Sequence, residues 1–187
     1  TEYVKTMKKL IEKAGVEILL NTEATPDKVK QYNPEAVFIA TGAVPVNPPI
    51  KGIEKAYKPE EILLNKVKVN GKVAVVGTGL TGLEVLEKLG DEGCQLAAVE
   101  MLSDIGPGVF PPIRKYIVED IMSHNIDCYT SHKLLEIKDN AIIIENIADR
   151  KITEVQCDSV VVSLGVAPQK GIADEYEKVF NKVIVIG

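Results

Sequence analysis

The chain has 187 residues, a formal net charge of −5 and 45% hydrophobic residues, which suffices for one domain or two small ones with a packed core. Only 5% of the residues are aromatic and the net charge is negative, so neither nucleic acid nor an acidic membrane surface is an expected partner. No apolar run approaches the length that spans a bilayer, and we expect no membrane partner.

The first third of the chain alternates helical and extended patterns. Thr25 is a suitable N-cap and Pro26 suits the first turn of the helix that follows. The prolines of residues 43–58 exclude a helix or a central strand, and we interpret this segment as a crossover between two domains. The predicted elements are helices over residues 1–14, 26–32 and 58–65 and strands over residues 16–20 and 36–40, the last one buried.

The middle of the chain carries a glycine-rich motif between a strand pattern and a helix pattern. Residues 73–76 predict a buried parallel strand, and a second apolar strand over residues 95–99 ends at Glu100. The helix between them is expected to close at Gly90 and Gly93. The turn that opens the helix consists of Gly77, Thr78, Gly79, Leu80, Thr81 and Gly82. A βαβ unit with this turn and a terminal acid is the fingerprint of dinucleotide-binding domains.

Each part of this fingerprint has a physical reason. Gly77 allows a tight turn, Gly79 lets a pyrophosphate approach the backbone, and Gly82 lets the helix pack close to the sheet. The free N–H groups and the positive dipole end of the helix attract phosphates. Glu100 accepts hydrogen bonds from a ribose diol and repels a 2′-phosphate, which favours NAD(H) over NADP(H). The alternative for the glycine turn is a helix-capping turn in an unrelated α/β domain. The alternative for Glu100 is a side chain that points to solvent and selects neither cofactor.

After Glu100 the α/β pattern continues and is interrupted by antiparallel strands. A loop rich in Gly and Pro over residues 103–112 precedes a helix, and a β-meander follows that helix. Pro168 and Gly171 mark a second crossover. The predicted elements are a helix over residues 113–124 and strands over residues 126–129, 134–137, 141–147, 152–155, 159–164 and 183–187.

Cysteine and histidine spacing argues against a metal site. The three cysteines lie far apart without a C-x-x-C pair, which also argues against a redox dithiol and fits buried reduced thiols in a cytoplasmic protein. His124 and His132 have no ligand-like spacing, so we expect loop or surface roles for both. No nucleophile and base stand in a pattern that predicts a catalytic pair.

Five short motifs follow one another along nearly the whole chain. They are Ile-Ala-Thr-Gly-Ala at residues 39–43, the glycine turn at 77–82, Val-Glu-Met at 99–101, Leu-Gly-Val-Ala-Pro at 164–168 and Val-Ile-Gly at 185–187. This set resembles the flavoprotein pyridine-nucleotide oxidoreductases that carry two dinucleotide-binding domains. The sequences of these motifs look most like the C-terminal part of the 2-enoate reductase, 2,4-dienoyl-CoA reductase and trimethylamine dehydrogenase group (NADH:flavin oxidoreductases).

The resemblance implies an α/β fold with a Rossmann-like NAD(H)-binding domain over residues 66–162 that contains the β-meander. Parts of a second, FAD-type α/β domain would flank it, formed by residues 1–50 and 163–187. On this basis Thr41 and Gly42 belong to the FAD side, and Met101 joins Glu100 in the NAD(H) motif. Gly165 would lie at the mouth of the NAD cleft. Glu84 would lie near the nicotinamide, and an ordinary first-turn acid on a helix dipole explains Glu84 equally well.

The resemblance also shows what this sequence does not carry. The FAD domain's glycine fingerprint, the dithiol of the disulphide reductases and the N-terminal barrel with flavin and iron–sulphur centre are all missing. We therefore expect a piece of a larger oxidoreductase, in which NADH bound here passes hydride to FAD and the remaining domains reduce the substrate. The piece alone should be inactive and colourless. The alternative is a non-catalytic ADP-binding or structural module, as in the trimethylamine dehydrogenase branch.

Overall fold

The computed structural model describes residues 2–124, 126–169 and 171–186. Contacts divide the chain into a smaller unit, residues 1–42 with 169–187, and a larger unit, residues 43–168. Gly187, the last residue of the fifth sequence motif, and Thr1, the first residue of the first predicted helix, lie outside the described residues. No helix in the described ranges is both long and apolar enough to cross a membrane.

The larger unit is built on a four-stranded parallel sheet in the order β5-β4-β3-β9. Strand β3 (Lys72–Val76) lies between β4 (Gln95–Val99) and β9 (Ser159–Val162) and runs parallel to both. Strand β5 (Asp127–Tyr129) pairs with the other side of β4. The prediction of a central parallel strand over residues 73–76 is therefore confirmed.

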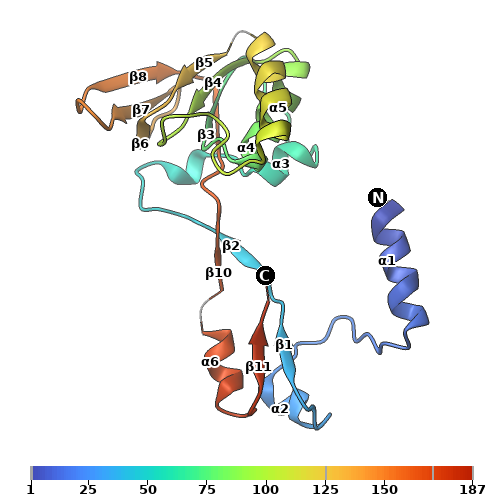
Figure 1. Ribbon diagram of the computed structural model, residues 1–187. Helices are drawn as coiled ribbons and strands as arrows, with labels where there is room; N and C mark the ends of the chain where they lie inside the picture. The colour runs from blue at the N-terminus through green and yellow to red at the C-terminus, as the bar shows by residue number, and fades with distance from the viewer. Residues whose placement is uncertain (1, 125, 170, 187) are drawn as a thin grey trace. The chain divides into compact units, whose positions relative to one another are not determined.

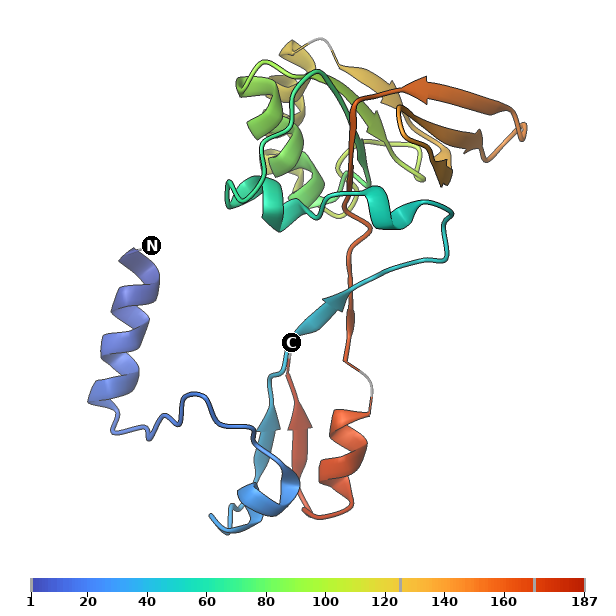
Figure 2. The ribbon, with the colours of Figure 1, turned by 180° about the vertical axis from the view of Figure 1, so that it is seen from behind.

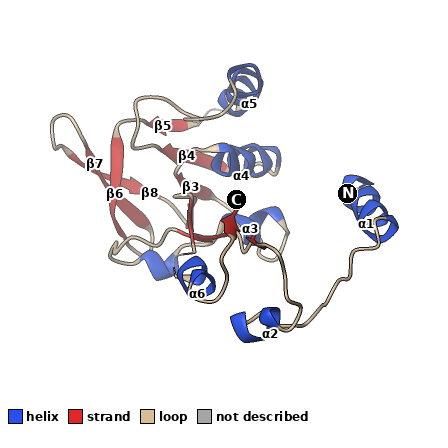
Figure 3. Cartoon of the chain, turned by 60° about the horizontal axis from the view of Figure 1, so that its bottom comes forward, coloured by secondary structure: helices blue, strands red, loops and turns tan. Residues whose placement is uncertain are grey.

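Two different layers cover the faces of this sheet (Figures 1 and 3). One face carries α3 (Pro59–Leu63), α4 (Leu80–Asp91) and α5 (Pro111–Ser123), and the other carries the antiparallel sheet of β6 (His132–Ile137), β7 (Ala141–Asn146) and β8 (Ile152–Gln156). Val73 and Val75 join the core beneath the helices, whereas Ala74 and Val76 join the core beneath the meander. Burial of both faces explains the uninterrupted apolar run.

The proline-rich segment contains two short elements. Strand β2 (Ala43–Pro45) pairs only with β10 (Val166–Pro168) among the described strands, in an antiparallel ribbon, and η1 (Ile53–Lys55) is a single 3₁₀ turn. The predicted exclusion of a central strand is confirmed, because proline has no N–H to donate to a neighbouring strand. The predicted exclusion of a helix holds apart from the single 3₁₀ turn. The two-stranded ribbon itself was not predicted.

Gly90 does not close α4 as the sequence suggested. It is buried inside the helix, and a Cβ on it would lie 2.7 Å from Cγ and Cδ2 of the His124 ring. Glycine at this position therefore lets the end of α5 approach α4. Gly93, with φ of 82°, does follow the helix end, and its N–H donates to the Gly90 carbonyl at 2.9 Å.

The smaller unit contains α1 (Glu2–Lys13), α2 (Pro26–Lys30) and α6 (Ile172–Glu177) with a two-stranded parallel sheet. Strand β1 (Val37–Ile39) pairs with β11 (Val183–Val185), and α6 leads into β11 (Figure 2). The N-cap prediction is confirmed, since the Lys28 N–H donates to Thr25 Oγ1 at 3.4 Å.

Two expectations for the smaller unit are wrong. Residues 16–20 form irregular chain with exposed apolar side chains, because no strand in the described part of the chain runs alongside to accept and donate ladder hydrogen bonds. Strand β1 is only partly buried: Ile39 is buried, whereas Phe38 on the opposite face is exposed.

Candidate functional site

The glycine turn joins β3 to α4, and two of its glycines are required by backbone packing. Gly77 has φ of 91°, and a Cβ there would lie 2.1 Å from the carbonyl oxygen of Ser163. A Cβ on Gly82 would lie 2.0 Å from the carbonyl oxygen of Gly77. The turn therefore closes only when both positions lack a side chain.

Gly79 differs from these two glycines because the space around it is open. It is the N-cap of α4 and has φ of −60°, and a Cβ built on it would meet no atom within 4 Å. Among the described residues no side chain hydrogen-bonds to this helix end, and Leu80 and Thr81 in the first turn are exposed. A helix N-terminus with an accessible backbone is the arrangement that binds phosphate groups.

Glu100 is buried and ties the glycine turn to the loop that follows β4. Its Oε2 accepts hydrogen bonds from the Thr78 N–H at 2.9 Å and the Thr78 hydroxyl at 2.7 Å, and its Oε1 accepts one from the Leu102 N–H at 3.0 Å. Thr78 Oγ1 in turn accepts from the Gly106 N–H at 3.2 Å. The carboxylate is not turned to solvent. Because a carboxylate has about four acceptor positions, one remains for a ligand hydroxyl.

A cleft of about 570 Å³ opens between the carboxyl ends of β3 and β4. Of the residues that the sequence singled out, it brings together Gly77, Thr78, Gly79, Glu100, Met101 and Gly165. The other cleft residues come from the proline-rich segment, the loop after β4, the start of β6 and the end of β9: Pro48, Ile50, Leu102, Pro107, His132, Lys133, Leu134, Ser163 and Leu164, besides Val76 and Val99. The carboxyl ends of parallel strands are where α/β proteins bind ligands.

Lys133 and His132 are cleft residues that sequence reasoning missed. The Lys133 ammonium lies 3.3 Å from the Glu145 carboxylate, and His132 Nδ1 lies 2.6 Å from the Thr130 carbonyl oxygen. Neither residue stands near the fingerprint in sequence, so no local spacing signalled them. They reach the cleft because β6 crosses the face of the parallel sheet. A cation therefore lines the same cleft as Glu100.

The remaining predicted site residues lie outside this cleft, and Gly165 also lines a second hollow. Thr81 and Gly165 line a second hollow of about 480 Å³, and Gly165 is shared with the first cleft. Glu84 is exposed on α4 and lines neither hollow. Thr41 and Gly42 are exposed residues of the smaller unit, and Gly42 has φ of 73°.

The three cysteines are free thiols, but the expectation that all are buried is wrong: Cys157 is buried, Cys94 is half-buried and Cys128 is exposed. Burial raises the pKa of the Cys157 thiol to about 11, and burial also raises the pKa of Cys94 and of Cys128. A thiol with a raised pKa stays protonated near neutral pH and is a poor nucleophile. None of the three cysteines lines the cleft.

Comparison with known proteins identifies the family of the chain. The family model described as pyridine nucleotide-disulphide oxidoreductase matches residues 1–185. The chain belongs to this family. It is 29% identical over 175 residues to the cinnamate reductase of Clostridium sporogenes, covering 92% of this chain and 26% of that protein. It is 31% identical over 155 residues to the bilirubin reductase of Mediterraneibacter gnavus, covering 82% of this chain and 24% of the relative.

Solved structures of other proteins show the same fold. A 2-naphthoyl-CoA reductase superposes with a TM-score of 0.80 at 29% identity, over 96% of this chain and 28% of the other. The histamine dehydrogenase from Rhizobium sp. 4-9 superposes with a TM-score of 0.69 at 14% identity, over 89% and 28%, and shows the fold alone. The chain spans about a quarter of the length of the curated relatives named above.

Proposed function

We propose that the cleft beside residues 77–82 binds NAD(H), and that in the intact protein this unit presents NADH to an FAD held with the remaining domains. The observation that carries the proposal is the open backbone of Gly79 at the start of α4, in the same cleft as the buried Glu100. When bound, NADH would supply a hydride to the flavin. The protein supplies binding and orientation.

The residues fit the parts of this cofactor. The N–H groups at the start of α4 face the open space at Gly79 and would hold the pyrophosphate. The free acceptor position on Glu100 would take a ribose hydroxyl, and the three hydrogen bonds to the carboxylate hold it in place for that role. Gly165 and Met101 would flank the ligand in the cleft. Leu80, Thr81 and Gly82 shape the helix start, and Glu84 and the FAD-side pair of Thr41 and Gly42 stay predictions.

NADH is the proposed cofactor rather than NADPH. A 2′-phosphate would bring nearly two negative charges to a carboxylate that is already buried, and repulsion of that kind is worth a few kcal/mol. Lys133 acts in the opposite direction, but its ammonium is paired with Glu145. We expect NADH to bind about ten times to a thousand times more tightly than NADPH.

We place the intact protein in the 2-enoate reductase group. Likeness to a cinnamate reductase and a 2-naphthoyl-CoA reductase supports this assignment. The assignment of residues 1–50 and 163–187 to an FAD-type domain and residues 66–162 to the NAD(H) domain is part of the same proposal. A cytoplasmic location of the intact protein is also part of this proposal.

A non-catalytic module that holds ADP is the second candidate. The glycine turn and Glu100 would serve it equally well, because ADP also carries a ribose and two phosphates. The structural likeness to histamine dehydrogenase concerns the fold and does not separate the two candidates. The difference between them is whether the nicotinamide part adds affinity.

Calorimetric titration of NADH, NADPH and ADP into the chain tests both candidates. We expect NADH to bind best and Gly79→Val to weaken NADH at least a hundredfold, because the branched side chain fills the open space where the phosphates would lie. Gly79→Ala is the graded control and should have a smaller effect. Unchanged circular dichroism would show that both variants fold. Equal affinity of the wild type for NADH and NADPH would contradict the assigned role of Glu100.

Equal affinity for NADH and ADP would favour the ADP module. The absorbance of the purified chain gives a separate check. We expect a colourless preparation, since Thr41 and Gly42 alone provide too few contacts for FAD. Stoichiometric flavin absorbance would show that the chain binds FAD by itself and that the boundary of the FAD-type domain is misplaced.

A further inference from the structure

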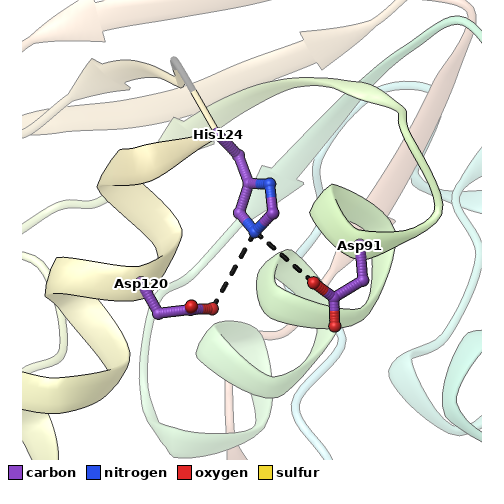
Figure 4. Close-up of side chains that lie close together, drawn as sticks. All are labelled: Asp91, Asp120 and His124. Carbon is purple, nitrogen blue, oxygen red and sulfur yellow. Dashed lines mark ion pairs between the residues drawn. The ribbon is translucent and has the colours of Figure 1, made fainter.

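Three metal-ligating side chains converge at the end of α4 opposite the cofactor cleft (Figure 4). Asp91 is the last residue of α4, Asp120 lies in the last turn of α5, and His124 is the C-cap of α5. Nε2 of His124 lies 3.6 Å from Oδ1 of Asp91 and 3.8 Å from Oδ2 of Asp120, and all three ligand atoms lie within 4.8 Å of one another.

The imidazole is held in this position by the fold. Its ring packs on Gly90, where a Cβ would come within 2.7 Å of it. Asp120 and His124 are four residues apart, so both project from the same face of α5. Two helices therefore supply the three side chains. His124, which lies closest to the neighbouring helix α4, has room there because residue 90 is glycine.

His124 Nε2 is a buried polar atom without a hydrogen-bond partner among the described residues. Both carboxylate oxygens are too far away for a hydrogen bond and both point toward it. A buried nitrogen left in this way costs free energy unless a cation or proton joins it to its neighbours. The His124 side chain as a whole is 23% exposed, but Nε2 itself is buried, and its lack of a partner points to a ligand between the three groups.

The electric field at this point also favours a cation. The C-terminal ends of α4 and α5 meet here, and each carries the negative end of a helix dipole. No basic residue lies in the last turn of α5, and Lys88 in the last turn of α4 is paired with Glu92 at 2.5 Å. Asp91 and Asp120 therefore lack a lysine or arginine partner in the described structure.

We propose that Asp91, Asp120 and His124 bind a divalent first-row transition metal ion such as Zn²⁺, which joins the ends of α4 and α5. Ligand atoms around tetrahedral zinc lie about 3.4 Å apart, given metal–ligand distances of about 2.0–2.2 Å. The 3.6 and 3.8 Å separations from Nε2 lie close to this value, and the two carboxylate oxygens lie within 4.8 Å of each other. Shifts of up to about 1.4 Å would bring all three atoms to the zinc geometry, and the exposed carboxylates of Asp91 and Asp120 are free to make them. An imidazole ligand selects against Mg²⁺ and Ca²⁺, which prefer oxygen alone. The remaining coordination position would take water.

The sequence contained part of this signal. The four-residue spacing of Asp120 and His124 suits a shared ligand, but Asp91 lies on another helix and only the packing of α4 against α5 brings it near. The proposal does not rest on the cofactor cleft, because α4 begins at the cleft and the metal ligands lie where it ends.

Calorimetric titration of Zn²⁺ into the chain, with NMR detection of the two histidine rings, tests the proposal. We expect Zn²⁺ to shift the His124 ring signals and leave His132 unchanged. His124→Gln should weaken Zn²⁺ binding at least tenfold, and Asp91→Asn and Asp120→Asn should each weaken it by about tenfold. Glu119→Gln, on α5 but outside the cluster, and His132→Gln are matched controls that should bind Zn²⁺ as the wild type does.

The competing outcome is a protonated His124 that forms ion pairs without a metal. In that case Zn²⁺ would leave the His124 signals in place, and the three cluster variants would bind Zn²⁺ as tightly as the two controls. Mg²⁺ displacing Zn²⁺ at equal concentration would also overturn the proposal. Circular dichroism of each variant separates a lost site from a lost fold. The NADH affinity of the three cluster variants, measured in parallel, should stay unchanged, which keeps this test distinct from that of the cofactor cleft.

Discussion

The two units of the chain share the same kinds of element but differ in how well they are buried. In the larger unit, β3 has a parallel neighbour on each side and a packed layer on each face. In the smaller unit, β1 has one neighbour, β11, and Ile39 and Tyr176 are the buried hydrophobic residues among those described. An alternating helix–strand pattern therefore does not make a core unless each strand finds neighbours and covered faces.

The largest effect expected from this comparison is the loss of stability when a leucine in the core is replaced by alanine. Leu86 in α4 is 0% exposed and lies in the core beneath the helices, whereas Leu10 in α1 is 53% exposed. Leu86→Ala should lower the free energy of unfolding of the larger unit by about 3–5 kcal/mol. Leu10→Ala, the matched substitution in the smaller unit, should change stability by less than about 0.5 kcal/mol. Denaturant unfolding followed by circular dichroism measures both, and similar losses would show that the units are equally well packed.

A smaller effect is expected within the glycine turn. Gly82→Ala places a Cβ against the Gly77 carbonyl oxygen and should destabilise the larger unit by about 1–3 kcal/mol. Gly79→Ala meets open space at a φ of −60°, so stability should be unchanged or rise by up to about 1 kcal/mol. Thermal unfolding of the two variants gives the comparison. A loss of stability in Gly79→Ala would mean that Gly79 is a packing residue and not a ligand contact.

The smallest effect concerns the pH dependence of the core beneath the meander. Because burial raises the pKa of Cys157 from 9.0 to about 11, the folded state holds this proton more tightly than the unfolded state does. Its contribution to stability is complete below pH 9 and is lost as pH rises toward 11, by roughly 1–2 kcal/mol. Urea unfolding at several pH values, with Cys157→Ala as the control, should show a flatter profile for the variant. Parallel profiles would mean that this thiol is solvated.

The prediction was most accurate for residues 72–101. The strand Gln95–Val99 was predicted with the bounds observed. The three glycines of the fingerprint fall in the turn after β3 and in the first turn of α4, and the acid directly follows β4, as the motif requires. Local patterns suffice here because the two strands of a βαβ unit pair with each other and are joined by the helix that packs on them. The prediction failed at residues 16–20, where an apolar run without a pairing strand stays irregular.

By itself, the sequence determined the α/β alternation, the family motifs and the types of residue at the glycine turn, because these depend on spacing along one stretch of chain. Only the tertiary structure decided what the side chains of Glu100, Lys133 and His124 contact. Glu100 is held by Thr78 and Leu102, Lys133 joins the cleft through the meander, and His124 reaches Asp91 across Gly90. Each of these depends on the approach of two elements that are distant in sequence, and no local pattern records such an approach.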